Sequence, residues 1–390
     1  VREAPALMFG LGRRFLLVAL FGAGLCAPAH GQRLTPSPPP TEVRGVVVDA
    51  ESGEPLPGAH VFISETMVGT TADSTGRFRL TGIRPGSKRL VVSMLGFEAQ
   101  RIDLFLRPDT TVSQTVSLTP IVLEAPEVVI EGERDEDWYD DLRTFKRLFI
   151  GSSELAAECA LVNPTVLRFD SGWWKGLEAT ATAPLQIENR ALGYRLHYAL
   201  KEFDQSGTVV KWDGDPHFEE LPPRDSAEAA RWQANRRRAY LGSLRHFLQA
   251  LLDDRLEEAG FSMVRLPRAG RIRDIGRADR FPASRDRIIE GRTDTTHVLD
   301  FRGRLEVTYR REGETQGYLR WTRDRSRRAR RVQTSWIELN DPPVHVDRYG
   351  EIVEPYGATV YGYFAYEQRM SGLLPREYRP ERTAEKSRPE

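Results

Sequence analysis

The side chains with the clearest potential for chemistry are a few histidines and glutamates in the second half of the chain. His217 is followed by Glu219 and Glu220, and His345 lies 128 residues after His217. Two histidines and one glutamate around an open position are the donor set of a catalytic zinc site. As one alternative, this set predicts a zinc-dependent peptidase.

The neighbourhood of His217 argues against that alternative. Leu221-Pro222-Pro223 follows the His-x-x-Glu pair at once, and we expect such a segment to hold zinc ligands poorly. No further arginine or glutamate can be assigned to a peptidase site, and loose two-residue patterns are common. We therefore predict no catalytic residue, no cofactor and no metal ligand in this chain.

The remaining histidines and cysteines have simpler interpretations. His60 stands at the start of a β-rich run and is expected at the surface or at the rim of the sandwich, and His197 is expected on a solvated strand face. His246 adjoins an apolar stripe, which favours packing at the boundary of the core. Cys159 follows Leu155-Ala156-Ala157 in a short helical pattern and is expected to be a buried, unreactive thiol.

The amino-terminal residues read as an export signal. Arg13 and Arg14 precede an apolar run of eleven residues, Phe15 to Leu25, which is too short to cross a bilayer. Small residues follow it, and we predict a secretory signal over residues 1–31. Cys26 would leave with that signal, so that Cys159 would have no intramolecular disulfide partner.

The charge balance restricts the class of partner. The 390 residues include 56 basic and 56 acidic side chains, which argues against a general polyanion binder. Arginines are dense from Arg265 to Arg331, but the whole chain has 50 arginines and 6 lysines, so this is partly a chain-wide preference. The export signal disfavours nucleic acid as a partner, whereas anionic lipid or polysaccharide remains an open alternative. Trp173-Trp174 is either a pair on which a sugar stacks or part of a hairpin that covers the core.

A Pro-rich linker over residues 32–41 leads into short β-rich runs. Proline and glycine in the intervening turns cannot continue a strand ladder, and Asp73 can accept hydrogen bonds from the backbone that follows it. This texture over residues 42–130 indicates a sandwich. The runs are Val43 to Val48, His60 to Ser64, Arg77 to Leu80, Arg89 to Met94, Gln100 to Phe105, Val112 to Leu118 and Glu127 to Ile130.

Three stretches within residues 42–130 resemble the carboxypeptidase-regulatory-like domain, a prealbumin-like β-sandwich with Greek-key strands: GVVVDAESGEPLPGAHVFI, GTTADSTGRFRL and IRPGSKRLVVSMLGFEAQ. The resemblance implies an accessory module of Bacteroidota-type envelope proteins, to which no catalysis is attributed. In zinc carboxypeptidases with such a sandwich, it follows a catalytic domain of about 300 residues. Here it comes first, and only about 255 residues follow it.

The rest of the chain predicts an α+β domain. A charged hinge over residues 131–137 precedes a helix, and the domain spans residues 138–378 before a flexible tail over 379–390. Tyr194, Leu196 and Tyr198 alternate with polar residues as in a strand with one buried face. Asp225 and Gly260 bound an expected single long helix that packs on a mainly antiparallel sheet. The domain also resembles an uncharacterised companion domain of envelope proteins.

Two classes of function follow from these patterns. The first is a non-catalytic exported protein of the periplasm, outer membrane or cell surface, whose sandwich binds an envelope protein or polysaccharide. The second is an envelope hydrolase, zinc carboxypeptidase-like or glycan-processing, with its site in the α+β domain. The first class is favoured, since no catalytic set can be assembled from the residues.

Overall fold

The computed structural model describes residues 41–121, 136–172, 175–267, 279–292, 296–323, 327–354 and 356–380. The predicted signal, most of the linker, the last predicted β run, Trp173-Trp174 and most of the tail lie outside these residues. Residues 38–390 form one compact unit. Among the described residues, none of the helices combines the length and apolar character needed to span a bilayer.

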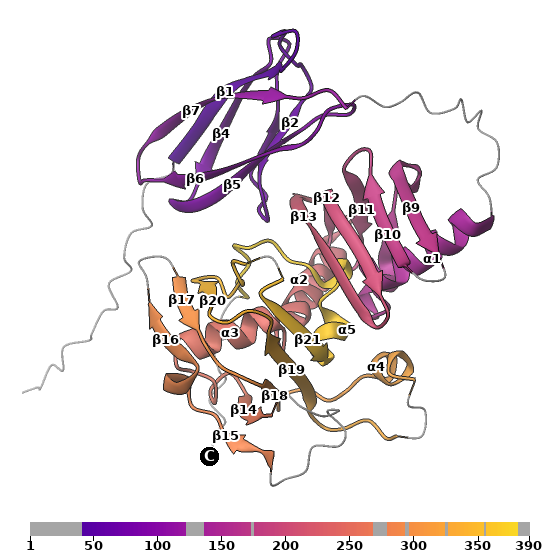
Figure 1. The fold of residues 1–390 in the computed structure, drawn as a ribbon, viewed down its shortest axis with the longest axis vertical. Helices are drawn as coiled ribbons and strands as arrows, with labels where there is room; N and C mark the ends of the chain where they lie inside the picture. Colours follow the sequence, from indigo (N-terminus) through magenta and orange to yellow (C-terminus); the bar gives the residue numbers. More distant parts are fainter. Residues whose placement is uncertain are drawn as a thin grey trace, which may run out of the picture. The chain divides into compact units, whose positions relative to one another are not determined.

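The first part of the chain is a sandwich of two sheets, as predicted (Figure 1). One sheet has the order β4-β1-β7, with β1 and β7 parallel, and the other has the order β3-β2-β5-β6. Their inward side chains form one core, which includes Val43, Val61 and Leu90. The strands are β1 Thr41–Asp49, β2 His60–Ile63, β3 Gly69–Thr71, β4 Arg77–Ile83, β5 Gly86–Ser93, β6 Gln100–Leu106 and β7 Thr111–Leu118.

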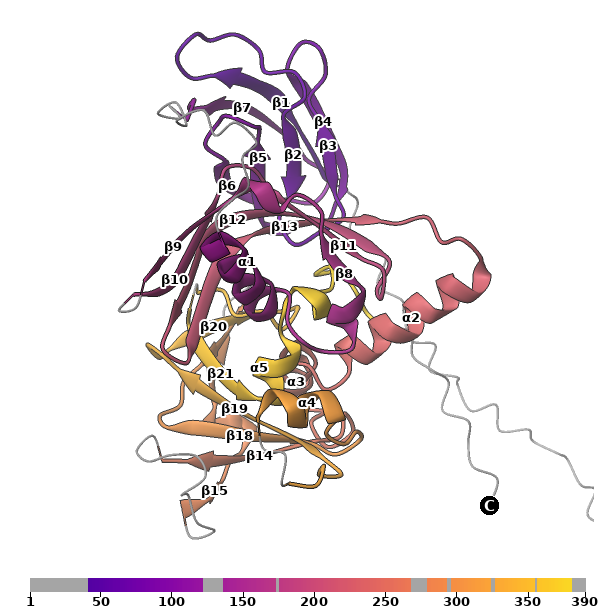
Figure 2. The same cartoon turned by 90° about the vertical axis from the view of Figure 1, so that its right-hand side faces the viewer.

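A six-stranded antiparallel sheet follows, covered on one face by helix α1, Glu136–Phe149 (Figure 2). Phe145 and Phe149 of α1 pack against Phe203 and Tyr198 of β12. Strand β12 pairs with β13 along one edge and with both β11 and β10 along the other. The strands are β8 Cys159–Leu161, β9 Leu167–Gly172, β10 Gly176–Ala181, β11 Leu185–Asn189, β12 Tyr194–Ser206 and β13 Val209–Glu220.

The remaining strands form a five-stranded sheet, β15-β14-β18-β19-β21, and a three-stranded sheet, β16-β17-β20. All of their pairings are antiparallel, which confirms the α+β class predicted for this region. The strands are β14 Phe261–Leu266, β15 Phe281–Pro282, β16 Ile289–Arg292, β17 Thr296–Leu299, β18 Arg304–Tyr309, β19 Gln333–Leu339, β20 Val344–Asp347 and β21 Ala358–Gly362.

The expected single long helix is wrong in one respect, because the structure divides it in two. Helix α2, Ser226–Tyr240, ends before Gly242, whose φ is +78°, and α3, Leu244–Leu252, begins after it. Ser243 caps α3 by accepting a hydrogen bond from the His246 backbone. A left-handed glycine followed by a capping serine ends one helix and starts another. The short helices are α4 Gln316–Trp321 and α5 Tyr363–Glu367.

Candidate functional site

Strands β12 and β13 carry polar side chains on the face that lies against the sandwich. His197 on β12 is the antiparallel partner of His217 on β13, and Arg195 is the partner of Glu219. Successive side chains of a strand point to opposite faces. His217 and Glu219 therefore share one face, while Phe218 enters the core on the other.

Strand β2 of the sandwich brings a third imidazole to this face. The ring centroids of His60 and His217 are 4.8 Å apart, and those of His60 and His197 are 5.2 Å apart. One donor atom each from His60, His217 and Glu219 lie within 4.8 Å of one another. His197 Nε2 lies 3.4 Å from a Glu219 carboxylate oxygen. We call these four residues, from three strands, the histidine cluster.

The cluster is shielded from solvent at its centre. The His217 residue is 4% exposed, and its ring nitrogens make no hydrogen bond of good geometry within the described residues, although the Met67 backbone lies near the ring. Burial, together with the neighbouring histidines, lowers the pKa of His60 and of His217 to about 4. Both rings are therefore neutral at pH 7, the form in which imidazole binds metal ions.

Strand β3 of the sandwich approaches the cluster so closely that residue 69 is required to be a glycine. A Cβ built on Gly69 would lie 2.3 Å from His217 Nε2. No carbon and nitrogen approach so closely without a bond, so only a residue without a side chain fits beside the ring. The β3 backbone thus forms one wall of the cluster.

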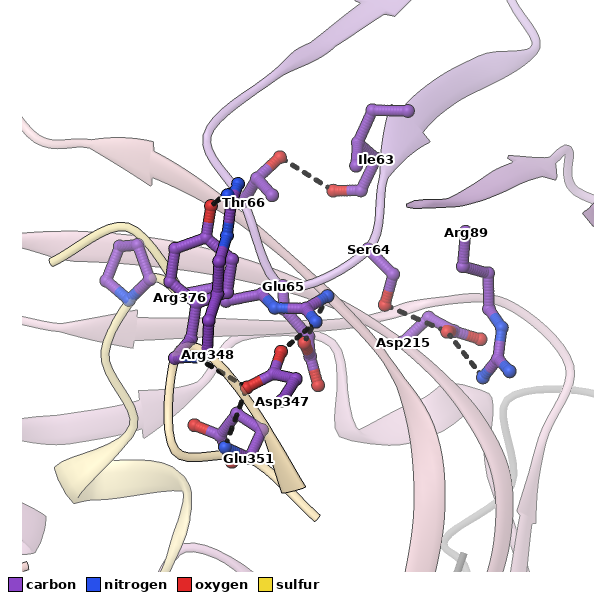
Figure 3. A network of polar contacts seen from close by, with 12 residues as sticks. Ile63, Ser64, Glu65, Thr66, Arg89, Asp215, Asp347, Arg348, Glu351 and Arg376 are labelled. Carbon is purple, nitrogen blue, oxygen red and sulfur yellow. Dashed lines mark hydrogen bonds and ion pairs between the residues drawn. The ribbon is translucent and has the colours of Figure 1, made fainter. Parts of the chain in front are cut away.

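Next to the cluster, the sandwich and the sheet meet through a dry patch and a buried carboxylate. Phe62, Val91 and Ala199 form the patch. Asp215, 2% exposed, accepts hydrogen bonds from Ser64 Oγ at 2.9 Å and from Arg101 Nε at 2.6 Å, as Figure 3 shows in part. Charge-assisted hydrogen bonds of this kind are stronger than neutral ones, so Asp215 is a firm anchor between the two parts of the chain.

The loop between β2 and β3 extends this contact, because its backbone pairs with the edge of β13 that does not face β12. The Glu65 N–H donates to the Pro216 carbonyl at 2.7 Å, and the Phe218 N–H donates to the Thr66 carbonyl at 3.0 Å. The Arg376 N–H donates to the Glu65 carbonyl at 2.8 Å, and its guanidinium pairs with Asp347 (Figure 3). The sandwich is therefore joined to the second region by backbone as well as side chains.

The structure does not assemble the donor set considered first for a zinc peptidase. His345 lies on β20, and its Nδ1 is 2.5 Å from Glu354 Oε1. Glu220, one residue beyond Glu219, pairs with Arg236. Instead, the ring of His217 lies beside the rings of His60 and His197.

The sequence interpretation of His197 is corrected, whereas those of His60 and His246 fit the structure. His197 Nε2 is buried, because the ring of His60 lies against it, so this histidine does not lie on a solvated face. His60 is half-buried, as expected for a residue at the rim. The ring of His246 packs against Phe261 and Tyr309, as expected for the boundary of the core. Cys159 is half-buried at the start of β8 rather than fully buried, and burial raises the pKa of its thiol to about 12, which fits an unreactive thiol.

Sequence reasoning missed the cluster because no local pattern joins its members. The strand period of two was a usable signal for His217 and Glu219 on one face. Nothing in the sequence indicates that His60, 157 residues before His217, lies against them. That proximity depends on how the two parts of the chain pack.

The two-sheet architecture of residues 41–121 places this part of the chain among the prealbumin-like β-sandwiches. Residues 43–130 match the model of the CarboxypepD_reg-like domain, so this stretch is a domain of that family. The TonB-dependent receptor SusC of Bacteroides thetaiotaomicron is 30% identical over 109 residues. That alignment covers 26% of this chain and only 10% of the receptor.

Solved structures show weaker likenesses. The 3-chlorocatechol 1,2-dioxygenase of Rhodococcus opacus is 14% identical, covers 22% of this chain and 62% of the dioxygenase, and has a TM-score of 0.18. The minor pilin GBS52 of Streptococcus agalactiae is 19% identical, covers 22% of this chain and 45% of the pilin, and has a TM-score of 0.19. With TM-scores this low, neither structure bears on function.

Proposed function

We propose that this chain is an exported cell-envelope protein whose β-sandwich binds a protein or glycan partner without catalysis. The family of residues 43–130 and the aligned stretch of a TonB-dependent receptor support this class. The observation that carries the proposal is that one sheet of the sandwich packs against the second region, whereas the other has an edge strand that is paired on one side within the described residues.

One sheet of the sandwich, β3-β2-β5-β6, packs against the second region through Phe62 and Val91, which are buried against Ala199. In the other sheet, β4-β1-β7, the edge strand β7 pairs with β1 alone within the described residues. Its residues Ser113, Thr115 and Ser117 are exposed at every second position. We call β7 and this row of hydroxyls the β7 surface.

The chemistry of the β7 surface fits a partner rich in hydrogen-bonding groups. An open strand edge can accept an extended peptide, whose backbone completes the ladder. A row of hydroxyls beside Arg44, whose Nε donates to Ser113 Oγ at 3.3 Å, can bind the hydroxyls or carboxylates of a polysaccharide. Both are partners of the class expected from the sequence.

Site-specific photo-crosslinking in the cells that make this protein tests the proposal. A photo-crosslinking residue in place of Ser113 should give one adduct of defined mass, because a partner on the β7 surface would lie within reach. The same residue in place of Ser206, an exposed position at the end of β12, is the matched control and should give none. A protease or a glycosidase applied to the adduct distinguishes a peptide from a glycan partner.

Two results would contradict the proposal. One is turnover of peptides or envelope glycans by the purified chain, which would support the hydrolase alternative. The other is equal crosslinking from Ser113 and Ser206, which would remove any role of the β7 surface. Export is tested separately by following an epitope-tagged chain with and without residues 1–31 in cell fractions.

A further inference from the structure

We propose that the histidine cluster binds one divalent transition-metal ion, Zn²⁺ in the first instance, with His60, His217, Glu219 and His197 as its ligands. The ion would join the sandwich to the second region. This inference goes beyond the binding function proposed for the β7 surface and does not depend on it.

The donor types are those that zinc prefers. Imidazole nitrogen binds Zn²⁺ at about 2.0–2.1 Å and carboxylate oxygen at about 2.0–2.2 Å. Magnesium and calcium favour sets made of oxygen donors, so three imidazoles discriminate against them. Donor atoms around a tetrahedral zinc lie about 3.3 Å apart. The three donors of His60, His217 and Glu219 lie within 4.8 Å, so modest side-chain rotations bring them to that spacing.

Unpartnered polar atoms at the centre of the cluster indicate a missing ligand. Within the described residues, neither ring nitrogen of His217 makes a hydrogen bond of good geometry, although the Met67 backbone lies near the ring, and His197 Nε2 has only the Glu219 carboxylate beside it, at 3.4 Å. Leaving such an atom buried without a partner costs about 1–3 kcal/mol. A metal ion bonded to one nitrogen of each ring would pair two of these three atoms.

The carboxylate of Glu219 is available to an ion. Its nearest cation is Arg195, whose guanidinium is 3.9 Å away and also pairs with Glu188 at 2.9 Å. The Glu219 side chain is 45% exposed, which gives an ion a route from solvent to the buried imidazoles. The site is therefore open to loading after the chain has folded.

The number of protein ligands defines the role of the ion. Catalytic zinc sites keep one position for water or substrate, whereas structural sites fill all four positions with protein atoms. His60, His217 and Glu219 supply three of the four positions, and His197, whose Nε2 lies 3.4 Å from Glu219, would turn towards the ion to supply the fourth. Because His60 lies on β2 while His197, His217 and Glu219 lie on β12 and β13, the ion would fix the sandwich against the second region.

Zinc binding by the purified chain, residues 32–390, tests the proposal. After chelator treatment and its removal, Zn²⁺ is titrated against a chromophoric competitor in the wild-type chain and in His60→Gln, His217→Gln, Glu219→Gln and His197→Gln. We expect one ion per chain in the wild type and at least tenfold weaker binding in each variant. Cobalt in place of zinc should give the intense visible absorption of a four-coordinate site.

His345→Gln is the matched control, because His345 also sits beside a carboxylate, Glu354, but outside the cluster. Its affinity for zinc should equal that of the wild type. Circular dichroism checks the fold of each variant, and the more exposed Glu219 provides the test if His217→Gln does not fold.

Three results would overturn the proposal. They are no stoichiometric zinc in the wild type at micromolar concentration, zinc binding that survives in all of the cluster variants, or loss of binding in His345→Gln. Full affinity in His197→Gln would overturn the closed, four-ligand form of the site. None of these results bears on crosslinking at the β7 surface, so the two proposals fail separately.

Discussion

Gly69 decides how closely the sandwich approaches the second region. It places backbone where any side chain would collide with the His217 ring, 2.3 Å from Nε2. The glycine was part of a recognisable turn-rich stretch, yet its reason lies in a residue almost 150 positions later. A close approach between distant segments produces no local sequence pattern, and the histidine cluster was therefore not predicted.

Gly69→Ala is expected to destabilise the protein by about 1–3 kcal/mol, since the added methyl group overpacks the wall of the cluster. Gly172→Ala is the matched control, because a Cβ at Gly172 meets no atom within 4 Å. Urea unfolding followed by circular dichroism compares the two. Equal stability of the two variants would show that β3 does not lie against His217.

Glu367 gives a pH-dependent test outside the site. Burial raises its pKa to about 7, so the folded protein holds this proton more tightly than the unfolded chain does. The stability from that proton is present below pH 4.5 and is lost as the pH rises towards 7. Glu367→Gln should therefore raise the free energy of unfolding at pH 8 by about 1–3 kcal/mol and change it little at pH 4.

The control for this test is Glu257→Gln, at an exposed carboxylate on the surface. Unfolding by urea at pH 4, 6 and 8 gives the comparison. A Glu367→Gln variant that is no more stable than the wild type at pH 8 would contradict the raised pKa of Glu367.

At the scale of elements, alternation and turn chemistry predicted most of the strands correctly. Tyr194, Leu196 and Tyr198 do face the core, because period two is a property of the strand itself. On the other face, Arg195 and Lys201 are exposed as predicted, but His197 was misjudged as solvated, since polar residues look alike whether water or another sheet covers them. Helix length was also misjudged, because Gly242 and Ser243 lie within a continuous apolar pattern.

Ser243→Ala tests the break between α2 and α3. Ser243 accepts a hydrogen bond from the His246 N–H at 3.1 Å, and its own hydroxyl donates to the Tyr240 carbonyl at 2.7 Å. Loss of this cap should cost about 1 kcal/mol of stability. Ser87→Ala, at an exposed position of β5, should cost little. If both substitutions have the same small effect, α2 and α3 form one continuous helix in solution.

At the scale of the whole molecule, the sandwich is built into the second region rather than tethered to it. A dry patch, a buried carboxylate and a backbone-paired loop all lie in this contact. The sequence predicted both architectures, but it indicated a hinge between them and gave no sign of their shared interface. Domain packing is determined by complementary surfaces, which composition and periodicity do not report.

Asp215→Asn should weaken this contact strongly. The substitution removes the buried charge that pairs with Arg101, and breaking such a pair costs about 2–4 kcal/mol after allowance for the partial exposure of Arg101. Asp213→Asn is the matched control, since Asp213 pairs with the exposed Lys201. The loss should appear in the unfolding of the whole chain, measured by tryptophan fluorescence. Equal losses in both variants would contradict a buried anchor.

Calorimetry of the chelator-treated chain, with and without zinc, tests the central claim that one interface and one ion unite the two parts. The account predicts a single unfolding transition that moves to higher temperature with zinc, with a stabilisation of about 2.7 kcal/mol when free zinc is 100 times the Kd. Two separate transitions, with the sandwich melting alone and no response to zinc, would contradict it.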